Sequence, residues 1–178
     1  DVILIGEIRD QETASNAVQA SLTGHLVFST LHTNDAASAV TRLVDMGIEP
    51  FLVSATLSGV LAQRLVRKLC PYCKRSIPIQ QLDLPPDFPK SKVETLYEAS
   101  SCRKCNGIGY SGQVAIFELM ELDHPIRKMA LQGSSPHLIE QYAIERGMVT
   151  IRQSGWQKVI EGSTSVDEIL RSTAMDLR

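Results

Sequence analysis

The sequence predicts an α/β fold with a four-cysteine subdomain inserted into it and a helical region toward its C-terminal side. An apolar run at Val2–Ile5 has the length and composition of a buried parallel strand, and a helical segment and a second strand follow it. Two Cys-x-x-Cys pairs enclose a proline-rich segment. These observations divide the chain into a partial α/β core at residues 1–69, a cysteine insert at 70–105, and a strand with C-terminal helices at 106–178.

Composition excludes several classes of protein. A hydrophobic fraction of 43% over 178 residues is enough for a core. A net charge of -2 and an aromatic content of 5% argue against a nucleic-acid-binding surface. The longest mostly apolar stretch, Pro50–Ala62, is too short to span a bilayer, and no signal peptide opens the sequence. We expect a cytoplasmic protein whose cysteines are reduced.

The first strand and the second should end at the same edge of a sheet. Asp10 is placed to cap the intervening helix, which should end at Gly24, and the second strand is expected over His25–Leu31. A strand, helix, strand crossover makes the two strands parallel. Gly6-Glu7 and Thr30–His32 should therefore emerge side by side, at the edge where open α/β sheets bind ligands.

Two further helices are expected before the first cysteine pair. Asn34 or Asp35 would cap the first of them, which should end near Gly47. Pro50 should begin the second, because proline fits the first turn of a helix. Its apolar positions continue to Leu65 at helical spacing, so we expect one helix over this whole stretch.

Two regions of different composition follow these helices. The prolines between the two cysteine pairs argue against regular structure over much of the insert. Tyr110–Met120 then has the composition of a strand, and the remainder is predicted to be helical. Ser165 and Glu168 have the spacing of a capping box before the last helix.

Glu7 is the first candidate for catalysis. The run Ile3–Ile5 followed by Gly6-Glu7 has the form of a Walker B strand, which delivers an acid to the sheet edge beside a nucleotide's magnesium. A carboxylate there can hold a magnesium-bound water or orient the attacking one. An acid in this place can also serve only to stabilise the following helix through its dipole. The strand by itself leaves these two interpretations equally open.

The longer strings around this acid resemble one family. Gly6–Thr13 and Ser29–Asn34 are similar to the Walker B and His boxes of the ATPases that drive type II secretion and type IV pili. The similarity continues through Ala39–Leu43, Met46–Phe51 and Leu61–Arg67, and on into the cysteines. The chain is thereby identified as a member of the type II secretion (GspE/PulE) ATPase family. The string Met46–Phe51 favours the secretion branch, with type IV pilus assembly as the alternative.

The resemblance implies the C-terminal part of a RecA-like P-loop NTPase core that uses ATP and Mg²⁺. It implies that Glu7 belongs to the magnesium and water shell, that His32 contacts the γ-phosphate region, and that Arg9 organises the same edge. It also suggests Thr30 and Arg64 as nucleotide-binding residues. The alternatives are a hydrogen-bonded core histidine for His32 and an ordinary exposed helical arginine for Arg64.

The sequence departs from the family in one respect, because no Gly-x-x-x-x-Gly-Lys-Ser/Thr string occurs in it. The backbone amides and lysine that cradle the phosphates are therefore missing. We expect them upstream of Asp1, and we expect the chain alone not to hydrolyse ATP. The resemblance further implies a homo-hexamer that associates peripherally with the inner membrane through proteins of a secretion platform.

The four cysteines predict a structural zinc site. Cys70 and Cys73 form one pair and Cys102 and Cys105 the other, with 28 residues between the pairs. Four thiolates satisfy the tetrahedral preference of zinc and leave no position for a reactive water. Unpaired core cysteines or a redox pair are the alternatives, and two matched pairs favour the metal.

A non-catalytic, zinc-bearing interaction module is the competing function from another class. It would account for the cysteines but would leave Glu7 and the string Thr30–Asn34 without a role. A nucleic-acid-binding zinc ribbon is the third possibility. The low aromatic content and the absence of a basic excess argue against the stacking and phosphate-binding surface that such a ribbon uses.

Overall fold

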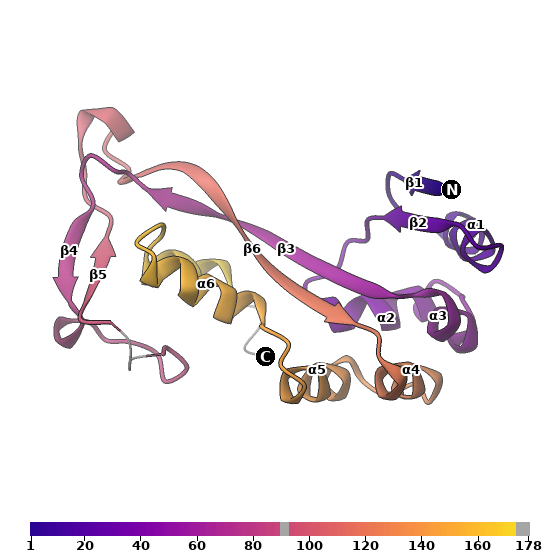
Figure 1. The fold of residues 1–178 in the computed structure, drawn as a ribbon. Coiled ribbons are helices and arrows are strands. Elements are labelled where there is room, and N and C mark those ends of the chain that lie inside the picture. Colours follow the sequence, from indigo (N-terminus) through magenta and orange to yellow (C-terminus); the bar gives the residue numbers. More distant parts are fainter. Residues whose placement is uncertain (90–92, 174–178) are drawn as a thin grey trace. The chain divides into compact units, whose positions relative to one another are not determined.

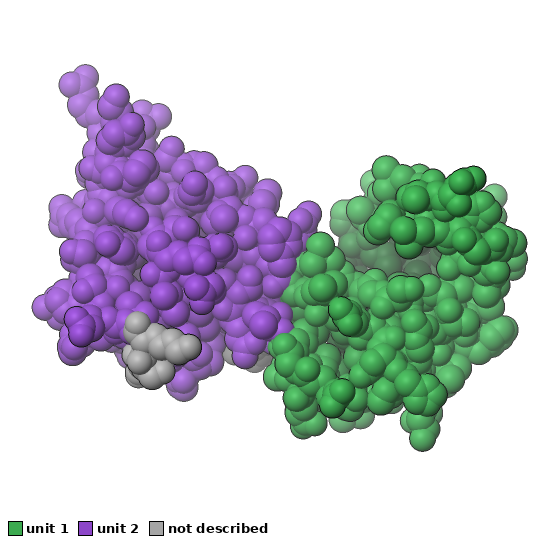
Figure 2. All heavy atoms as spheres, viewed as in Figure 1, with its two compact units in different colours: residues 1–62, 118–148 green, residues 63–117, 149–178 purple. Residues whose placement is uncertain are grey.

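The computed structural model describes residues 1–89 and 93–173, and the chain divides into two compact units. Unit 1 contains residues 1–62 and 118–148, and unit 2 contains residues 63–117 and the chain from residue 149 (Figure 2). Each unit is therefore discontinuous in sequence. Within the described ranges, none of the helices is both long enough and apolar enough to cross a membrane.

Unit 1 begins with the predicted strand, helix and strand. Strand β1 (Val2–Ile5), helix α1 (Gln11–Leu22) and strand β2 (Leu26–Ser29) follow one another, and β1 lies parallel to β2 with Ile5 opposite Ser29 (Figure 1). The side chain of Asp10 caps α1 by accepting a hydrogen bond from the Thr13 amide at 2.8 Å. The parallel crossover is confirmed, and β2 is shorter at both ends than the predicted strand. The prediction that Val2–Ile5 is buried is wrong, because Val2 and Leu4 are exposed.

The second helix is confirmed and the third is much shorter than predicted. Helix α2 (Ala36–Asp45) is capped by Asp35, and helix α3 (Pro50–Thr56) ends where strand β3 (Gly59–Leu69) soon begins. The prediction that one helix continues to Leu65 is therefore wrong. Burial alternates along most of β3, with Leu61 and Leu65 both exposed, as in a strand.

Strand β6 (Tyr110–Glu121) confirms the predicted strand and supplies the partner of β3. In unit 1 the Leu122 amide donates to the Ser58 carbonyl at 3.0 Å, whereas in unit 2 the Cys70 amide donates to the Gly109 carbonyl at 2.9 Å. The two strands therefore run antiparallel. The boundary between the two units falls inside both strands.

The core of unit 1 is built from helices and the last part of β6. Helices α4 (His124–Leu131) and α5 (Pro136–Glu145) are capped by Asp123 and Ser135, and they contact α3 and α2 respectively. Their buried side chains join one apolar cluster with those of the earlier elements, which includes Ala14, Val18, Val40, Val53, Met120, Ile126 and Ile139. This cluster fixes the helices that flank the strand edge described below.

Unit 2 contains the cysteine insert, and part of the insert is regular structure. Strands β4 (Arg75–Pro78) and β5 (Thr95–Glu98) pair antiparallel (Figure 1), and two short 3₁₀ turns cover Ile79–Gln81 and Arg103–Cys105. These two strands have four residues each and are compatible with the prediction from the prolines, which concerned much of the insert and not all of it. Pro78 lies at the end of β4, where no inner ladder bond is lost.

The insert is anchored to helix α6 (Ile151–Ile160) by an aromatic and ionic contact. Asp87 accepts from Arg152 Nε at 2.6 Å and from Trp156 Nε1 at 2.8 Å. The ring of Phe88 meets the Trp156 ring edge-on at a centroid distance of 5.4 Å. The proline-rich segment is thus packed against a helix by contacts that do not involve the cysteines.

The last helix, α7 (Val166–Ser172), is capped by Ser165 as predicted, but the Glu168 side chain does not complete a capping box. Its buried carboxylate accepts from Arg67 Nη2 at 2.6 Å and from Arg171 Nη2 at 2.7 Å. The reciprocal capping box occurs instead at Thr150 and Gln153, before α6. Burial alone would raise the pKa of Glu168, but the hydrogen bonds from Arg171 and Arg67 lower it to about 2.

We expect Glu168→Gln to lower the free energy of unfolding by about 3 kcal/mol at pH 7, because it leaves the charge of Arg67 without its buried partner. The folded-state pKa of Glu168 is depressed, so its contribution is present above the ordinary pKa of 4.5 and is lost as the pH falls toward 2. Denaturant titration followed by fluorescence of Trp156 measures both effects. The difference in the free energy of unfolding between wild type and variant should become smaller below pH 4.5.

Glu161→Gln is the matched control, because Glu161 pairs with Lys158 at the surface of the same unit. An exposed pair of this kind contributes at most about 1 kcal/mol. Equal losses of stability in the Glu161 and Glu168 variants would contradict the importance assigned to the buried pair.

Candidate functional site

The segments that follow β1 and β2 are joined by two hydrogen bonds. Thr30 Oγ1 donates to the Gly6 carbonyl at 2.8 Å, and the Ile8 amide donates to the Thr30 carbonyl at 3.0 Å. The crossover rule predicts that these segments emerge together, and the structure confirms it. The hydroxyl hydrogen of Thr30 is therefore used in a hydrogen bond that joins the two segments.

Glu7 lies at the centre of this edge. Its Oε2 is 2.5 Å from Nε of Arg9, and its Oε1 makes a close contact with Nε2 of His32. The Glu7 side chain is only 21% exposed, whereas those of Arg9 and His32 are 76% and 87% exposed. A carboxylate is therefore set into the edge with two side chains of basic character reaching outward beside it.

The Glu7 oxygen beside His32 has unused hydrogen-bonding capacity. Oε1 is buried, and among the described residues its one polar contact is with Nε2 of His32. A carboxylate oxygen has two lone pairs, so one of them remains for a water, an ion or a ligand. A hard cation such as Mg²⁺ binds through oxygen atoms and waters, and Glu7 fits that requirement.

His32 does not have the environment of a core histidine. With 87% of its side chain exposed, the alternative of a hydrogen-bonded core residue is wrong. Its imidazole contacts Glu7 and is otherwise exposed at the edge. The structure thus brings together Glu7, Arg9, Thr30 and His32, four of the five residues predicted to serve nucleotide chemistry.

Arg64 is the fifth of these residues, and its predicted position on a helix is wrong. It lies on β3 and belongs to unit 2, whereas the other four residues belong to unit 1. Its guanidinium donates to the Ser172 carbonyl of α7. The structure gives Arg64 a partner within unit 2.

Glu118 was not among the predicted site residues, and its carboxylate is buried in unit 1 and accepts from the Ala36 amide at 2.8 Å. The available signal was an acid at an inward-facing position of an alternating strand, between the buried Ile116 and Met120. Such an acid needs a polar partner from elsewhere in the fold.

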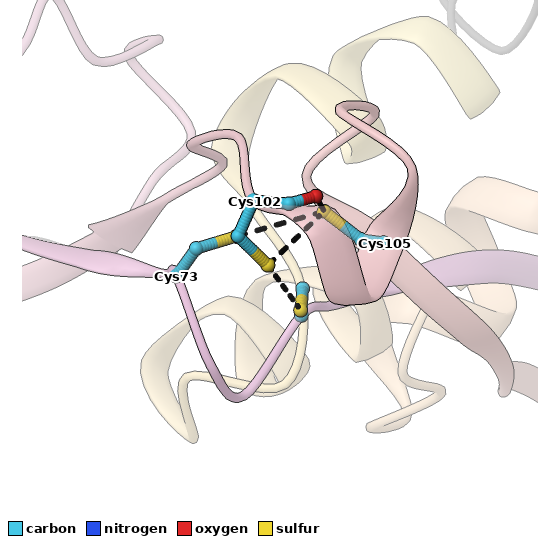
Figure 3. A group of neighbouring side chains, drawn as sticks. Cys73, Cys102 and Cys105 are labelled. Atoms are coloured by element: carbon cyan, nitrogen blue, oxygen red, sulfur yellow. Dashed lines mark hydrogen bonds between the residues drawn. The ribbon is translucent and has the colours of Figure 1, made fainter.

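The four cysteine sulfurs converge on one point of unit 2. The Cys70–Cys102 sulfur distance is 3.9 Å, and the Cys73–Cys105 and Cys102–Cys105 distances are both 3.7 Å. Figure 3 shows Cys73, Cys102 and Cys105 turned toward one another. A tetrahedron of sulfurs around zinc, with bonds of about 2.3 Å, has edges of about 3.8 Å. The spacing therefore fits zinc and is far too long for disulfides, which need about 2.05 Å.

The backbone around the sulfurs is shaped for a metal site. The Gly109 amide donates to Cys105 Sγ at 3.2 Å. Gly109 has a φ of +77°, and a Cβ there would lie 2.5 Å from the Ser100 carbonyl oxygen, so only glycine fits. Burial raises the pKa of Cys105, but hydrogen bonds with the backbone of Cys102 and Gly109 outweigh it and lower the pKa to about 6. The thiolate is thus favoured at Cys105. Burial, followed by hydrogen bonds with the other three cysteines, raises the pKa of Cys73 to about 12.

The family model and the sequence relatives that match this chain agree with each other. A family model described as "Type II/IV secretion system protein" matches residues 1–171. The chain is 48% identical over 184 residues to the type IV pilus assembly ATPase PilB of Myxococcus xanthus, covering 99% of this chain and 32% of that protein. It is 50% identical over 175 residues to the type II secretion system ATPase E of Vibrio cholerae, covering 97% and 34%. The chain spans about a third of the length of these curated relatives.

A solved structure shares the fold. The ATPase DotB of Legionella pneumophila matches with a TM-score of 0.64 at 21% sequence identity, over 98% of this chain and 38% of that one. At this identity the match shows the fold alone. The sequence relatives include both pilus and secretion ATPases at nearly equal identity, so identity does not distinguish the two systems.

Proposed function

Because the chain belongs to the type II/IV secretion system protein family, we propose that it is part of a RecA-like P-loop ATPase that powers type II protein secretion. The observation that carries this proposal is the Glu7 carboxylate, set at a parallel-strand edge between Arg9 and the exposed His32. Type IV pilus assembly is the second candidate, since a pilus ATPase is equally similar. The string Met46–Phe51 favours secretion.

In this proposal each residue of the edge has a separate role in hydrolysis. When bound with ATP, Mg²⁺ supplies charge neutralisation for the phosphates. Glu7 would hold a water near that ion through its carboxylate, and His32, whose side chain is exposed beside it, would offer a hydrogen bond to the terminal phosphate. Arg9 orients the Glu7 carboxylate through Oε2, and Thr30 fixes the two segments relative to each other. Arg64 remains a proposed contact to nucleotide or to a neighbouring subunit.

We place the phosphate-binding loop in another part of the intact protein, since these 178 residues contain no such string. The test is an ATPase assay with excess Mg²⁺ and with chelator. The intact protein should hydrolyse ATP only with the metal, and the 178-residue chain alone should not. An intact protein that binds zinc but never hydrolyses ATP would favour the competing function, a non-catalytic interaction module.

The zinc site has a structural role in this proposal. Four thiolates from Cys70, Cys73, Cys102 and Cys105 complete the coordination of one ion and leave no site for activated water. We place the insert outside the phosphate chemistry, as a surface that docks on inner-membrane platform proteins from the cytoplasmic side.

Assembly into a homo-hexameric ring is a separate prediction. A ring forms when one patch of a subunit meets a different patch of the next and the rotation closes. Because the chain spans about a third of its relatives, we expect the intact protein to form hexamers with ATP and the 178-residue chain to associate weakly. Light scattering coupled to size-exclusion chromatography measures both masses. A stable hexamer of the 178 residues alone would contradict this division of the contact surface.

A further inference from the structure

Glu118 is a buried acid whose contact crosses a long stretch of sequence. The residue is 3% exposed, and its Oε1 accepts from the amide of Ala36, 82 residues away, at 2.8 Å. Ala36 is the first residue of α2, and Asp35 already caps that helix by accepting from the Ser38 amide at 2.7 Å. Burying a carboxylate is costly, so a second acid at this helix start needs a reason beyond capping.

The contact lies at one end of the segment that carries His32. At the other end, Thr30 is tied to Gly6 and Ile8 by hydrogen bonds of 2.8 and 3.0 Å. Within the described residues, the His32 side chain has a polar contact only with Glu7. Because the imidazole is 87% exposed, packing gives it little support. Its position therefore depends on its contact with Glu7 and on the backbone of the segment, where Leu31 packs against the core.

We propose that Glu118 is a positioning residue for the ATPase reaction, because it holds the C-terminal end of the His32 segment against β6. The inference rests on the proposed function for the role of His32. Glu118 does not touch the reacting atoms. Its carboxylate fixes Ala36, Ala36 fixes the segment, and the segment sets the reach of His32 beside Glu7. Loss of the acceptor leaves a buried amide unpaired, and the segment then relaxes.

The effect on catalysis should be selective. A small displacement of a catalytic group lowers the rate of the chemical step much more than it weakens binding of a substrate held by many other contacts. We therefore expect Glu118→Ala in the intact protein to lower kcat about tenfold to a hundredfold while KM for ATP changes less than about threefold. Glu118→Gln keeps an oxygen that can accept from Ala36 and should recover most of the rate.

Hydrogen exchange separates this role from general loss of stability. In the intact protein, Glu118→Ala should raise amide exchange in residues 31–36 about tenfold or more and leave α4 and α5 near wild type. Ile126→Ala is the matched control, because Ile126 is 2% exposed in the same core and lies on α4, away from the segment. That control should raise exchange throughout unit 1 without singling out residues 31–36.

The outcomes are distinct. Unchanged exchange at 31–36 in Glu118→Ala, or an increase spread evenly over unit 1 as in the control, would overturn the positioning role. So would a rise in KM with unchanged kcat. If the wild type does not hydrolyse ATP at all, the proposed function is wrong, and the exchange pattern alone still decides whether Glu118 holds the segment.

Discussion

Glu7→Gln in the intact protein should lower ATP turnover at least about a hundredfold while ATP binding stays within about threefold of wild type, a loss of about 3 kcal/mol of transition-state stabilisation. The substitution keeps the size of the side chain and removes the charge. One of the two carboxylate oxygens, which contact Arg9 and His32, is replaced by an amide nitrogen. Because phosphate binding depends on other residues, affinity for ATP should survive.

The matched control is Glu12→Gln, an exposed acid in the first turn of α1, close in sequence but without a role at the edge. Steady-state turnover and binding of a fluorescent ATP analogue measure the two quantities. The control should retain wild-type turnover. If the Glu7 variant also turns over ATP at the wild-type rate, Glu7 is not part of the catalytic site.

Cys70→Ser should lower bound zinc from about one equivalent per chain to well below half, and it should loosen residues 70–105. A zinc–thiolate shell is coupled to folding and contributes on the order of 10 kcal/mol in small zinc domains. The contacts of Asp87 with α6 should keep part of the insert in place. Elemental analysis measures the metal, and limited proteolysis measures the loosening.

Ser101→Ala is the control for the zinc prediction, because Ser101 is exposed and adjoins Cys102 without offering a metal ligand. It should bind zinc like the wild type. Amide hydrogen exchange in residues 1–62 should stay near wild type in both variants. In Cys70→Ser, ATP hydrolysis should fall less than secretion does. Full zinc occupancy in a Cys70→Ser/Cys102→Ser double variant would contradict the four-thiolate site.

Some features followed from sequence because their causes are local or general. Asp10 and Asp35 are caps because their side chains reach amides three residues on. The meeting of Gly6 with Thr30 follows from the handedness of the crossover, which holds without knowledge of the rest of the fold. The equal spacing of the cysteine pairs indicated a shared centre, and the sulfur distances agree.

Other features depend on partners that are distant in sequence. The segment after Thr56 has leucines four residues apart, as in a helix, and it becomes a strand because β6 pairs with it about 50 residues later. Glu168 has the spacing of a capping residue, but Arg67, 101 residues away, takes its carboxylate. No local pattern contains these partners, so neither outcome could be predicted from the segment alone.

The central claim is that the edge formed by Glu7 and His32 is where the magnesium of ATP lies. The most direct measurement is a crystal structure of the intact protein with Mn²⁺ in place of Mg²⁺ and a non-hydrolysable ATP analogue, in which anomalous scattering locates the metal. The account predicts a manganese peak within about 5 Å of the Glu7 carboxylate, bridged by a water or bound directly. A nucleotide-bound manganese more than about 10 Å from Glu7, with His32 facing solvent, would contradict it.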